Sequence, residues 1–263
     1  MARLRVHSMR LSLALLAALP ICAQGAERCW YFDVHRFTPD LTGHFQGVSN
    51  GSPISVDFRD DLGLKRDSTR IGASLEYQGP RFGLELSTDS QTYAGLNTVA
   101  RAITIEGQTY QANTLVTSSV KATSTNFDWT IRFLTRPQFW VGVDLGARLT
   151  VLNLDASGVS AFSGVNASAS CKATLPIPQL GPSLGFTAFD DRLVGRGMVH
   201  MLAFKGATYT HLGADLRYFP VDWLGVRAFL DSERFRVPNG SIKDDLDITL
   251  DRTGTGLGVV FRF

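Results

Sequence analysis

Two groups of residues in this sequence have types and spacings suited to hydrolytic chemistry. Asp60 and Asp61 form a carboxylate pair that could activate water if a histidine lay beside them. His211 and Asp215 have the types of a general base and its orienting acid. Asp bonds its own backbone readily and Gly63 follows, so we expect a turn at Asp60-Asp61. On a strand four residues span about 13 Å, so His211 and Asp215 cannot bond each other directly.

The other candidates for catalysis and metal binding do not form a recognisable site. His44 and His200 stand in segments whose partners the sequence does not identify, and no converging Ser, His and acid set is visible. Cys29 and Cys171 cannot make a metal cluster, whereas a disulfide between them stays open as an alternative in an oxidising compartment. We therefore predict a protein that is not an enzyme, with no cofactor and no bound metal.

A third group consists of charged residues that alternate with apolar ones, and their two signs nearly balance. The predicted inward-facing set is Arg70, Glu76, Glu85, Asp128, Arg132, Asp144, Arg148, Asp215, Arg217, Arg227, Asp231, Arg252 and Arg262. In a narrow barrel, enclosed charges persist only when they are paired or hydrated. We expect a salt-bridged interior that fills the barrel. A narrow conduit for small solutes is the alternative, because wide aqueous pores need about 16 to 18 strands.

Long strands that are apolar on one side must position these charges. Residues 139–151 alternate between apolar side chains and Gly, Asp, Arg or Thr, and residues 70–77 do the same. Such a length fits a tilted strand that crosses a bilayer. The predicted strands are 37–48, 69–78, 82–95, 119–134, 139–155, 169–189, 193–204, 207–219, 224–236 and 247–263. This pattern predicts an all-β, transmembrane, antiparallel up-and-down β-barrel of about 10 strands, with 8 or 12 as alternatives.

Aromatic residues gather at the short connections, which is typical of a girdle at one membrane interface. The predicted girdle contains Tyr77, Phe82, Phe133, Phe139, Trp140, Phe189, Tyr218, Phe219, Trp223, Phe261 and Phe263. An even strand number places both termini on this periplasmic side. The long connections 49–68, 96–118, 156–168 and 238–246 then face outward, with a tight outer turn at 205–206. We expect 96–118 to extend the wall as a hairpin and 156–168 to be a mobile loop.

The first 25 residues have the layout of a secretory signal peptide. Arg3, Arg5 and Arg10 precede a short apolar run, and small residues follow it. Cleavage after Gly25 would leave one barrel domain, 26–263, with 23 basic and 24 acidic residues, a charge that predicts no nucleic-acid partner. The apolar run is shorter than the ~20 residues of a membrane helix.

The C-terminal residues GLGVVFRF place Leu257, Val259, Phe261 and Phe263 on one face of a strand. This ending resembles the C-terminal signature of Gram-negative outer-membrane barrels. The resemblance implies that the barrel-assembly insertase reads these four residues as an insertion signal. The whole mature chain resembles small barrels of the OmpA-like kind, and DFRDDLGL (57–64) is similar to a stretch in uncharacterised members.

The resemblance implies a cellular location and partners but no named activity. We expect an outer-membrane protein that reaches its membrane after Sec-type export, contacts outer-membrane lipid and is a monomer. Its predicted function is structural or that of a narrow, porin-like channel for small solutes with a charged interior. A lipid-modifying outer-membrane enzyme, a surface-exposed binding or adhesion barrel and a secreted soluble β-sandwich are the alternatives.

Overall fold

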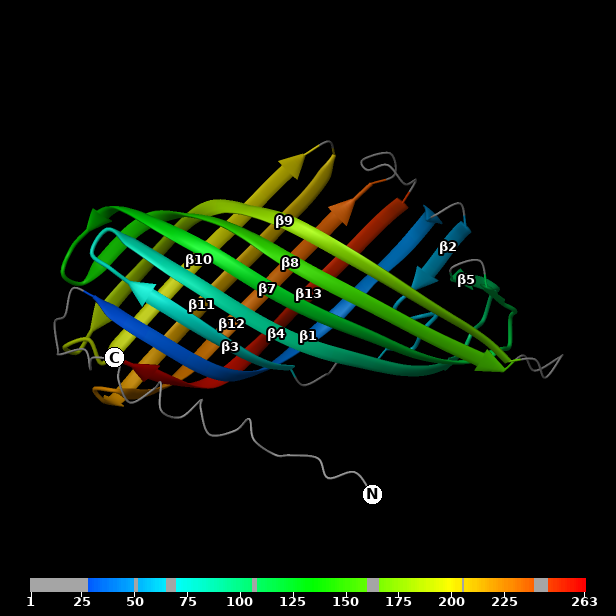
Figure 1. Cartoon of the computed structure of the whole chain (residues 1–263), viewed down its shortest axis with the longest axis horizontal. Coiled ribbons are helices and arrows are strands. Elements are labelled where there is room, and N and C mark those ends of the chain that lie inside the picture. The colour runs from blue at the N-terminus through cyan, green and yellow to red at the C-terminus, as the bar shows by residue number, and fades with distance from the viewer. Residues whose placement is uncertain are drawn as a thin grey trace, which may run out of the picture.

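The strands of the chain close into a ring. The computed structural model describes residues 28–49, 52–64, 70–105, 108–159, 166–204, 206–238 and 246–263. Ten of the thirteen strands in these ranges follow one another around the barrel wall (Figure 1). They are β1 (Cys29–Ser49), β3 (Arg70–Gln78), β4 (Phe82–Thr98), β7 (Leu115–Thr135), β8 (Phe139–Val159), β9 (Asn166–Ala188), β10 (Leu193–Phe204), β11 (Ala207–Val221), β12 (Leu224–Val237) and β13 (Leu246–Arg262).

The first and last strands seal the ring. β13 pairs antiparallel with β1 from Tyr31↔Arg262 to Gly47↔Leu246. Next to this pairing, Trp30 and Phe263 exchange backbone hydrogen bonds of 2.7 and 3.0 Å. Closure leaves no open sheet edge in the wall. An open edge would leave backbone N–H and C=O groups without hydrogen-bond partners in lipid. The predicted transmembrane β-barrel of ten strands is therefore confirmed.

The two faces of the wall have opposite character. Large apolar side chains are exposed on the outside, as at Leu257 (71% exposed) and Ile71 (68%), while Asp144 (0%) and Arg217 (1%) are buried inside. A soluble protein would place these side chains the other way round, so the outer face is suited to lipid. No helix in the described residues is long and apolar enough to cross a membrane.

Aromatic rings form a belt around the end of the barrel that carries the termini and the short turns, here called the inner end. Trp30, Tyr77 and Phe82 lie in a row with ring centroids 5.0 and 5.4 Å apart. Phe261 stacks on Trp223 with a centroid distance of 6.3 Å.

Three of the predicted girdle aromatics have little exposed surface, namely Trp140 (9% exposed), Phe219 (0%) and Phe263 (8%). Trp140 and Phe219 face inward, so their assignment to the lipid face was wrong. For Trp140 and Phe219 the reason is the alternation of the strand, because Phe139 and Tyr218 take the outward positions beside them. Phe263 follows the last strand residue and is held by the backbone of Trp30.

The first strand begins earlier than predicted. β1 starts at Cys29, eight residues before the expected start at Phe37. Cys29 lies at the inner end, whereas Cys171 pairs with Leu154 in the outer part of the wall, so the two cysteines stand at opposite ends of the barrel. The predicted signal peptide lies outside the described residues, as do positions 160–165 of the predicted mobile loop.

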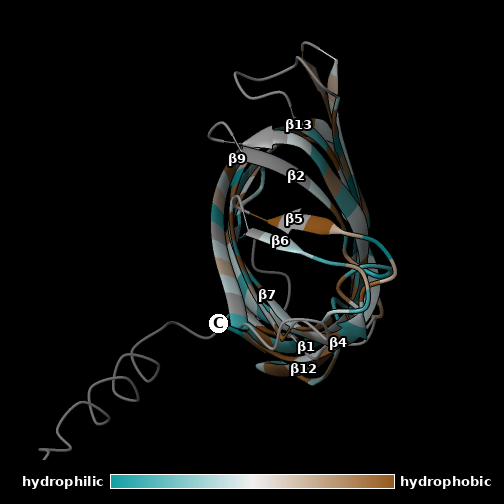
Figure 2. Ribbon diagram, turned by 90° about the vertical axis from the view of Figure 1, so that its right-hand side faces the viewer, coloured by the Kyte–Doolittle hydropathy of each residue, from teal (hydrophilic) through white to brown (hydrophobic). Residues whose placement is uncertain are grey.

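An inward-folded segment covers the outer end of the barrel, and we call it the outer cap. It consists of β2 (Ser52–Asp57), the turn 58–64, and residues 99–114 with β5 (Ile103–Ile105) and β6 (Gln108–Tyr110). β2 folds back on β1 and also pairs with β5. Figure 2 shows β5 and β6 lying across the opening. The expected hairpin in 96–118 therefore exists, but it turns into the lumen instead of extending the wall.

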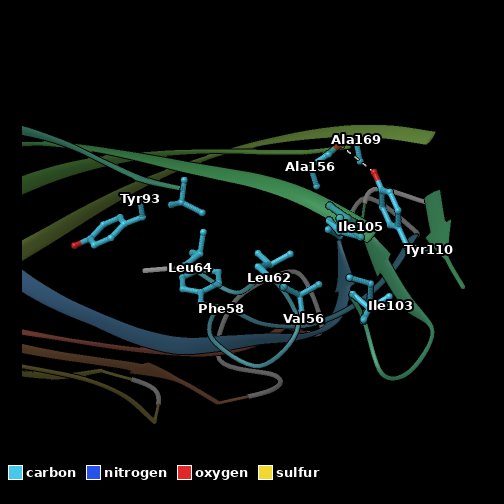
Figure 3. Close-up of a cluster of buried hydrophobic side chains, with 13 residues drawn as sticks. Val56, Phe58, Leu62, Leu64, Tyr93, Ile103, Ile105, Tyr110, Ala156 and Ala169 are labelled. Carbon is cyan, nitrogen blue, oxygen red and sulfur yellow. Dashed lines mark hydrogen bonds between the residues drawn. The ribbon is translucent and has the colours of Figure 1, made fainter. Parts of the chain in front are cut away.

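The outer cap has an apolar core of its own. Phe58, Leu62, Ile103 and Ile105, each at most 2% exposed, pack against inward-facing wall residues such as Val120 (Figure 3). Two hydrogen bonds also join the cap to the wall. The hydroxyl of Tyr110 donates to the carbonyl of Ala156 over 3.1 Å, and Ser118 donates to the carbonyl of Leu62 over 2.8 Å.

Asp60-Asp61 forms the predicted turn. The amide of Asp60 donates to the Asp57 carboxylate, and Asp61 accepts from the Asp57 amide over 2.8 Å. Gly63 has the left-handed φ of 62° that closes this turn. Asp61 points inward and forms an ion pair with Arg101 at 2.5 Å, whereas Asp60 is exposed. The two carboxylates thus diverge.

Candidate functional site: the charged network of the lumen

The charged side chains of the wall meet in the middle of the lumen in two groups. The inner network contains Asp33, Glu76, Glu85, Asp144, Arg196, Asp215, Arg217 and Arg227. The outer network contains Asp89, Arg148, His211, Asp231, Glu233 and Arg252. Each network joins side chains from strands that are not neighbours in the sheet, so the contacts cross the interior.

Arg196 of β10 is the centre of the inner network. Its guanidinium lies 2.7 Å from Glu85 of β4, 3.0 Å from Asp144 of β8 and 3.7 Å from Glu76 of β3. It also donates to the Thr130 hydroxyl of β7 over 3.2 Å. A buried guanidinium is stable only with well-placed acceptors, and here one side chain connects β10 to four strands that are not its neighbours in the sheet.

Arg217 and Arg227 continue the inner network toward β1. Arg217 lies 2.6 Å from Glu76 and 2.9 Å from Asp215, and Arg227 lies 3.6 Å from Asp215. Arg227 also binds Asp33. Asp33 further accepts hydrogen bonds of 2.5 Å from Ser74 and His35. These carboxylates each have several donors, which offset the cost of their burial.

The outer network is built on β12. Glu233 binds Arg148 and lies 2.5 Å from Arg252, while Asp231 lies 2.8 Å from His211 and 3.2 Å from Arg252. Arg148 reaches from β8 across the lumen to Glu233.

One tyrosine and one glutamine side chain complete the outer network. The Tyr209 hydroxyl donates to Glu233 over 3.2 Å and accepts from Gln179 over 2.9 Å. Both side chains are buried, Tyr209 with 3% exposed. The network therefore includes neutral hydrogen-bonding groups between its charges.

Two histidines connect the networks. His200 of β10 faces His211 of β11, its cross-strand partner, with ring centroids 5.4 Å apart. His200 lies 3.4 Å from Asp144 of the inner network, and His211 bonds Asp231 of the outer network. As expected, His211 does not bond Asp215, which pairs with arginines instead.

Asp144, His200 and Ser183 lie close together but do not have the order of a nucleophilic triad. Asp144 lies between Ser183, 2.7 Å away, and His200, whereas a nucleophilic triad needs the histidine in the middle. The donor atoms of His211, Asp231 and Glu233 do lie within 4.8 Å of one another, as metal ligands would. However, Arg148 and Arg252 already bind these carboxylates, and their charge would repel a divalent cation.

The remaining predicted inward residues lie around these networks. Asp128 is 1% exposed and accepts from Asn126. Arg132 and Arg262 lie nearer the inner end, where they donate to backbone carbonyls of Gly79 and of Asp222 and Asp191. The side chain of Arg70 lies outside the described part of the chain.

Comparison with known proteins identifies the fold. No protein-family model and no curated protein sequence matches the chain. The outer membrane protease OmpT of Escherichia coli superposes with a TM-score of 0.62 at 10% identity, over 89% of this chain and 97% of OmpT. The chain has the fold of an outer-membrane β-barrel. Ail, the attachment invasion locus protein of Yersinia pestis, matches at a TM-score of 0.34 and 12% identity, over 90% of this chain and 100% of Ail.

Several residues of the two networks were not predicted. Asp33 was missed because it precedes the expected start of the first strand. Arg196 was missed because the two faces of its strand do not differ in hydropathy. Its inward face also carries Val194 and Met198, and the outward face carries Gly195 and Gly197.

Glu233 could have been found from the sequence. It follows Asp231 by two residues within the predicted strand 224–236 and therefore shares its inward face. Asp89 likewise follows Glu85 by four residues, within the predicted strand 82–95. The partners of these residues, in contrast, depend on which strands face each other across the lumen.

Proposed function

We propose that this protein is a structural barrel of the bacterial outer membrane whose lumen is closed in its resting state. The belt of outward apolar and aromatic residues and the likeness in fold support this location. The function would then reside in the rigid wall and in the surface that the outer cap presents, not in a permanent pore. Both termini and the short turns would face the periplasm.

One observation carries the proposal: Arg196 bridges the lumen. Its contacts with Glu85, Asp144 and Glu76 connect β10 through the interior to β4, β8 and β3, none of which is its neighbour in the sheet. Ten strands enclose little more space than a filled eight-stranded barrel, so these side chains occupy the interior. The outer cap adds a second, apolar closure above the networks, where cavities of only 50 and 70 Å³ lie beside Phe58.

The narrow solute conduit is the second candidate. A cavity of 820 Å³ at the inner end leads up to Arg196, as a channel entrance would. Conduction would require the ion pairs of both networks to rearrange and the outer cap to move. The same architecture supports the lipid-modifying alternative less well, because His200 and His211 are buried in the lumen, away from lipid.

Conductance in planar bilayers tests the proposal. The mature chain is refolded in detergent, its barrel is verified by the change in gel mobility on boiling, and single-channel current is recorded. We expect no current steps. Regular steps from the unmodified chain would overturn the closed barrel and favour the conduit.

A variant with both closures weakened is the matched control. It combines Glu85→Ser and Arg196→Ser in the inner network and Arg148→Ser and Glu233→Ser in the outer network with replacement of residues 99–113 by a short Gly-Ser linker, and we expect small current steps from it. If this variant folds but is also silent, the two networks and residues 99–113 are not what blocks the lumen. Mass spectrometry of lipid A with and without expression tests the enzyme alternative, for which we expect an unchanged profile.

A further inference from the structure

The inner end of the barrel contains a large cavity. It has a volume of 820 Å³ and lies between the short turns and the inner network. Its wall comes from the turns at residues 79–80, 135–138 and 187–191 and from the ends of β1, β10 and β13. We call it the inner vestibule. Its size falls within the range of about 300 to 1,000 Å³ that is typical of small-molecule sites.

Arginines dominate the charges of the inner vestibule. Arg132, Arg136, Arg196 and Arg262 line it, against the two carboxylates of Asp190 and Asp191. Arg196 forms its ceiling and is neutralised by the acids above it. The other arginines are nearer the opening, so they face whatever enters from the inner end.

Arg132 and Arg262 differ from the arginines deeper in the lumen. Each arginine of the two networks lies in an ion pair, whereas neither Arg132 nor Arg262 contacts a carboxylate among the described residues. Arg132 donates to the carbonyl of Gly79 over 2.8 Å, and its Nε is buried without a partner. Arg262 donates to the carbonyls of Asp222 and Asp191, each over 2.8 Å, although only 4% of it is exposed.

Aromatic rings hold both guanidinium groups in place. Arg132 lies over the ring of Trp140 at 4.4 Å, and Arg262 lies over the ring of Phe219 at 4.3 Å. Stacking and backbone bonds fix the two side chains before any ligand arrives, which reduces the ordering cost of binding. Two oriented positive charges that form no direct ion pair among the described residues, in a cavity of this size, are suited to an anion.

We propose that the inner vestibule binds a small oxyanion, a phosphate or carboxylate group, through Arg132 and Arg262. The planar fork of a guanidinium matches such a group with two parallel N–H donors, which an ammonium cannot do. The ligand is either the free ion or a small organic molecule that carries the group. This inference does not depend on closure of the lumen, because the vestibule lies below the inner network.

Calorimetric titration of the folded full-length mature barrel in detergent tests this site. Inorganic phosphate, phenyl phosphate and benzoate are the three probes. We expect at least one to bind the unmodified chain, and both Arg132→Gln and Arg262→Gln to weaken its binding about tenfold or more. Equal binding of the two phosphates would identify the free ion as sufficient, and tighter binding of phenyl phosphate would identify an organic ligand.

Arg192→Gln is the matched control, because Arg192 is exposed on an inner turn and does not line the vestibule. It removes the same charge from the same end, and we expect unchanged binding. Arg132→Lys keeps the charge without the fork and should restore only part of the affinity. Gel mobility before and after boiling verifies folding. Absence of binding by all three probes, or equal loss in R192Q and R132Q, would overturn the proposal.

Discussion

The inner network and the outer cap close the same lumen by opposite means. The network, at membrane depth, closes it with charged side chains that are almost all paired, because enclosed polar groups are tolerated only with partners. The cap, at the outer end, closes it with an apolar cluster like that of a soluble protein. The comparison indicates that the medium outside the wall determines whether polar or apolar side chains face the lumen. Where the outside is lipid the interior is polar, and beyond the lipid an apolar interior becomes possible.

Removal of the central arginine should have the largest effect on stability. Arg196→Met leaves Glu85, Asp144 and Glu76 without their shared counter-charge, which typically costs about 3–5 kcal/mol. We expect the free energy of unfolding to fall by that amount, measured by denaturant unfolding of the refolded barrel.

Arg234→Met provides the comparison for this prediction. Arg234 pairs with Asp251 at 2.7 Å, but 61% of its side chain is exposed. An exposed pair contributes only about 0–1 kcal/mol. A similar loss of stability in the two variants would mean that the inner network is not a specially stabilising feature of the lumen.

The wall could be predicted from the sequence, because alternation is a local property. The expected strands 193–204, 207–219 and 224–236 nearly match β10, β11 and β12. The start of β1 could not be found in this way. Arg36 occupies an exposed outward position there, while Tyr31 and Phe37 face inward, so neither face of the segment is uniformly apolar.

The networks and the cap depend on information that is not local. Arg196 and Glu85 are 111 residues apart, and only the closed ring brings them together. The cap breaks the rule that apolar residues face outward, since Val120 and Leu152 are inward-facing apolar residues in the outer part of the wall. Hydropathy alone does not reveal where along a strand the membrane ends.

A substitution in the outer cap should have a smaller global effect. Phe58→Ala removes a ring that is 2% exposed, and a Phe→Ala change in a core costs about 3–5 kcal/mol. We expect this loss to appear mainly as local opening of the cap, because the wall does not depend on the cap for its backbone pairing. Hydrogen exchange should therefore accelerate in residues 99–105, while unfolding of the barrel changes little.

Leu96→Ala is the control for the cap, since Leu96 is 63% exposed near the end of β4. Unchanged exchange of the cap is expected in this variant. If Phe58→Ala instead unfolds the whole barrel at lower denaturant concentration, the cap and the wall form one cooperative unit and the contrast between the two closures does not hold.

Loss of a neutral hydrogen-bonding group of the outer network should lower the free energy of unfolding by less than loss of Arg196. Tyr209→Phe removes the hydroxyl between Glu233 and Gln179, which leaves a buried amide donor of Gln179 without its partner. A buried unsatisfied group costs about 1–3 kcal/mol. Denaturant unfolding should show a loss in this range. Tyr218→Phe is the matched control on the same strand, because 47% of Tyr218 is exposed on the outer face, and it should leave stability unchanged.

The smallest effect is expected at the rim of the outer cap, where the apolar closure meets an ion pair. Arg101 lies 2.5 Å from Asp61, and 53% of the Arg101 side chain is exposed whereas only 6% of the Asp61 side chain is. Solvent screens the guanidinium and the buried carboxylate keeps a backbone donor, so Arg101→Met should destabilise the cap by about 1 kcal/mol. Asp61 keeps its hydrogen bond from the Asp57 amide and the turn remains. Hydrogen exchange of the cap should thus change far less than in Phe58→Ala, and a comparable acceleration would show that charge pairing stabilises the outer closure as it does the inner one.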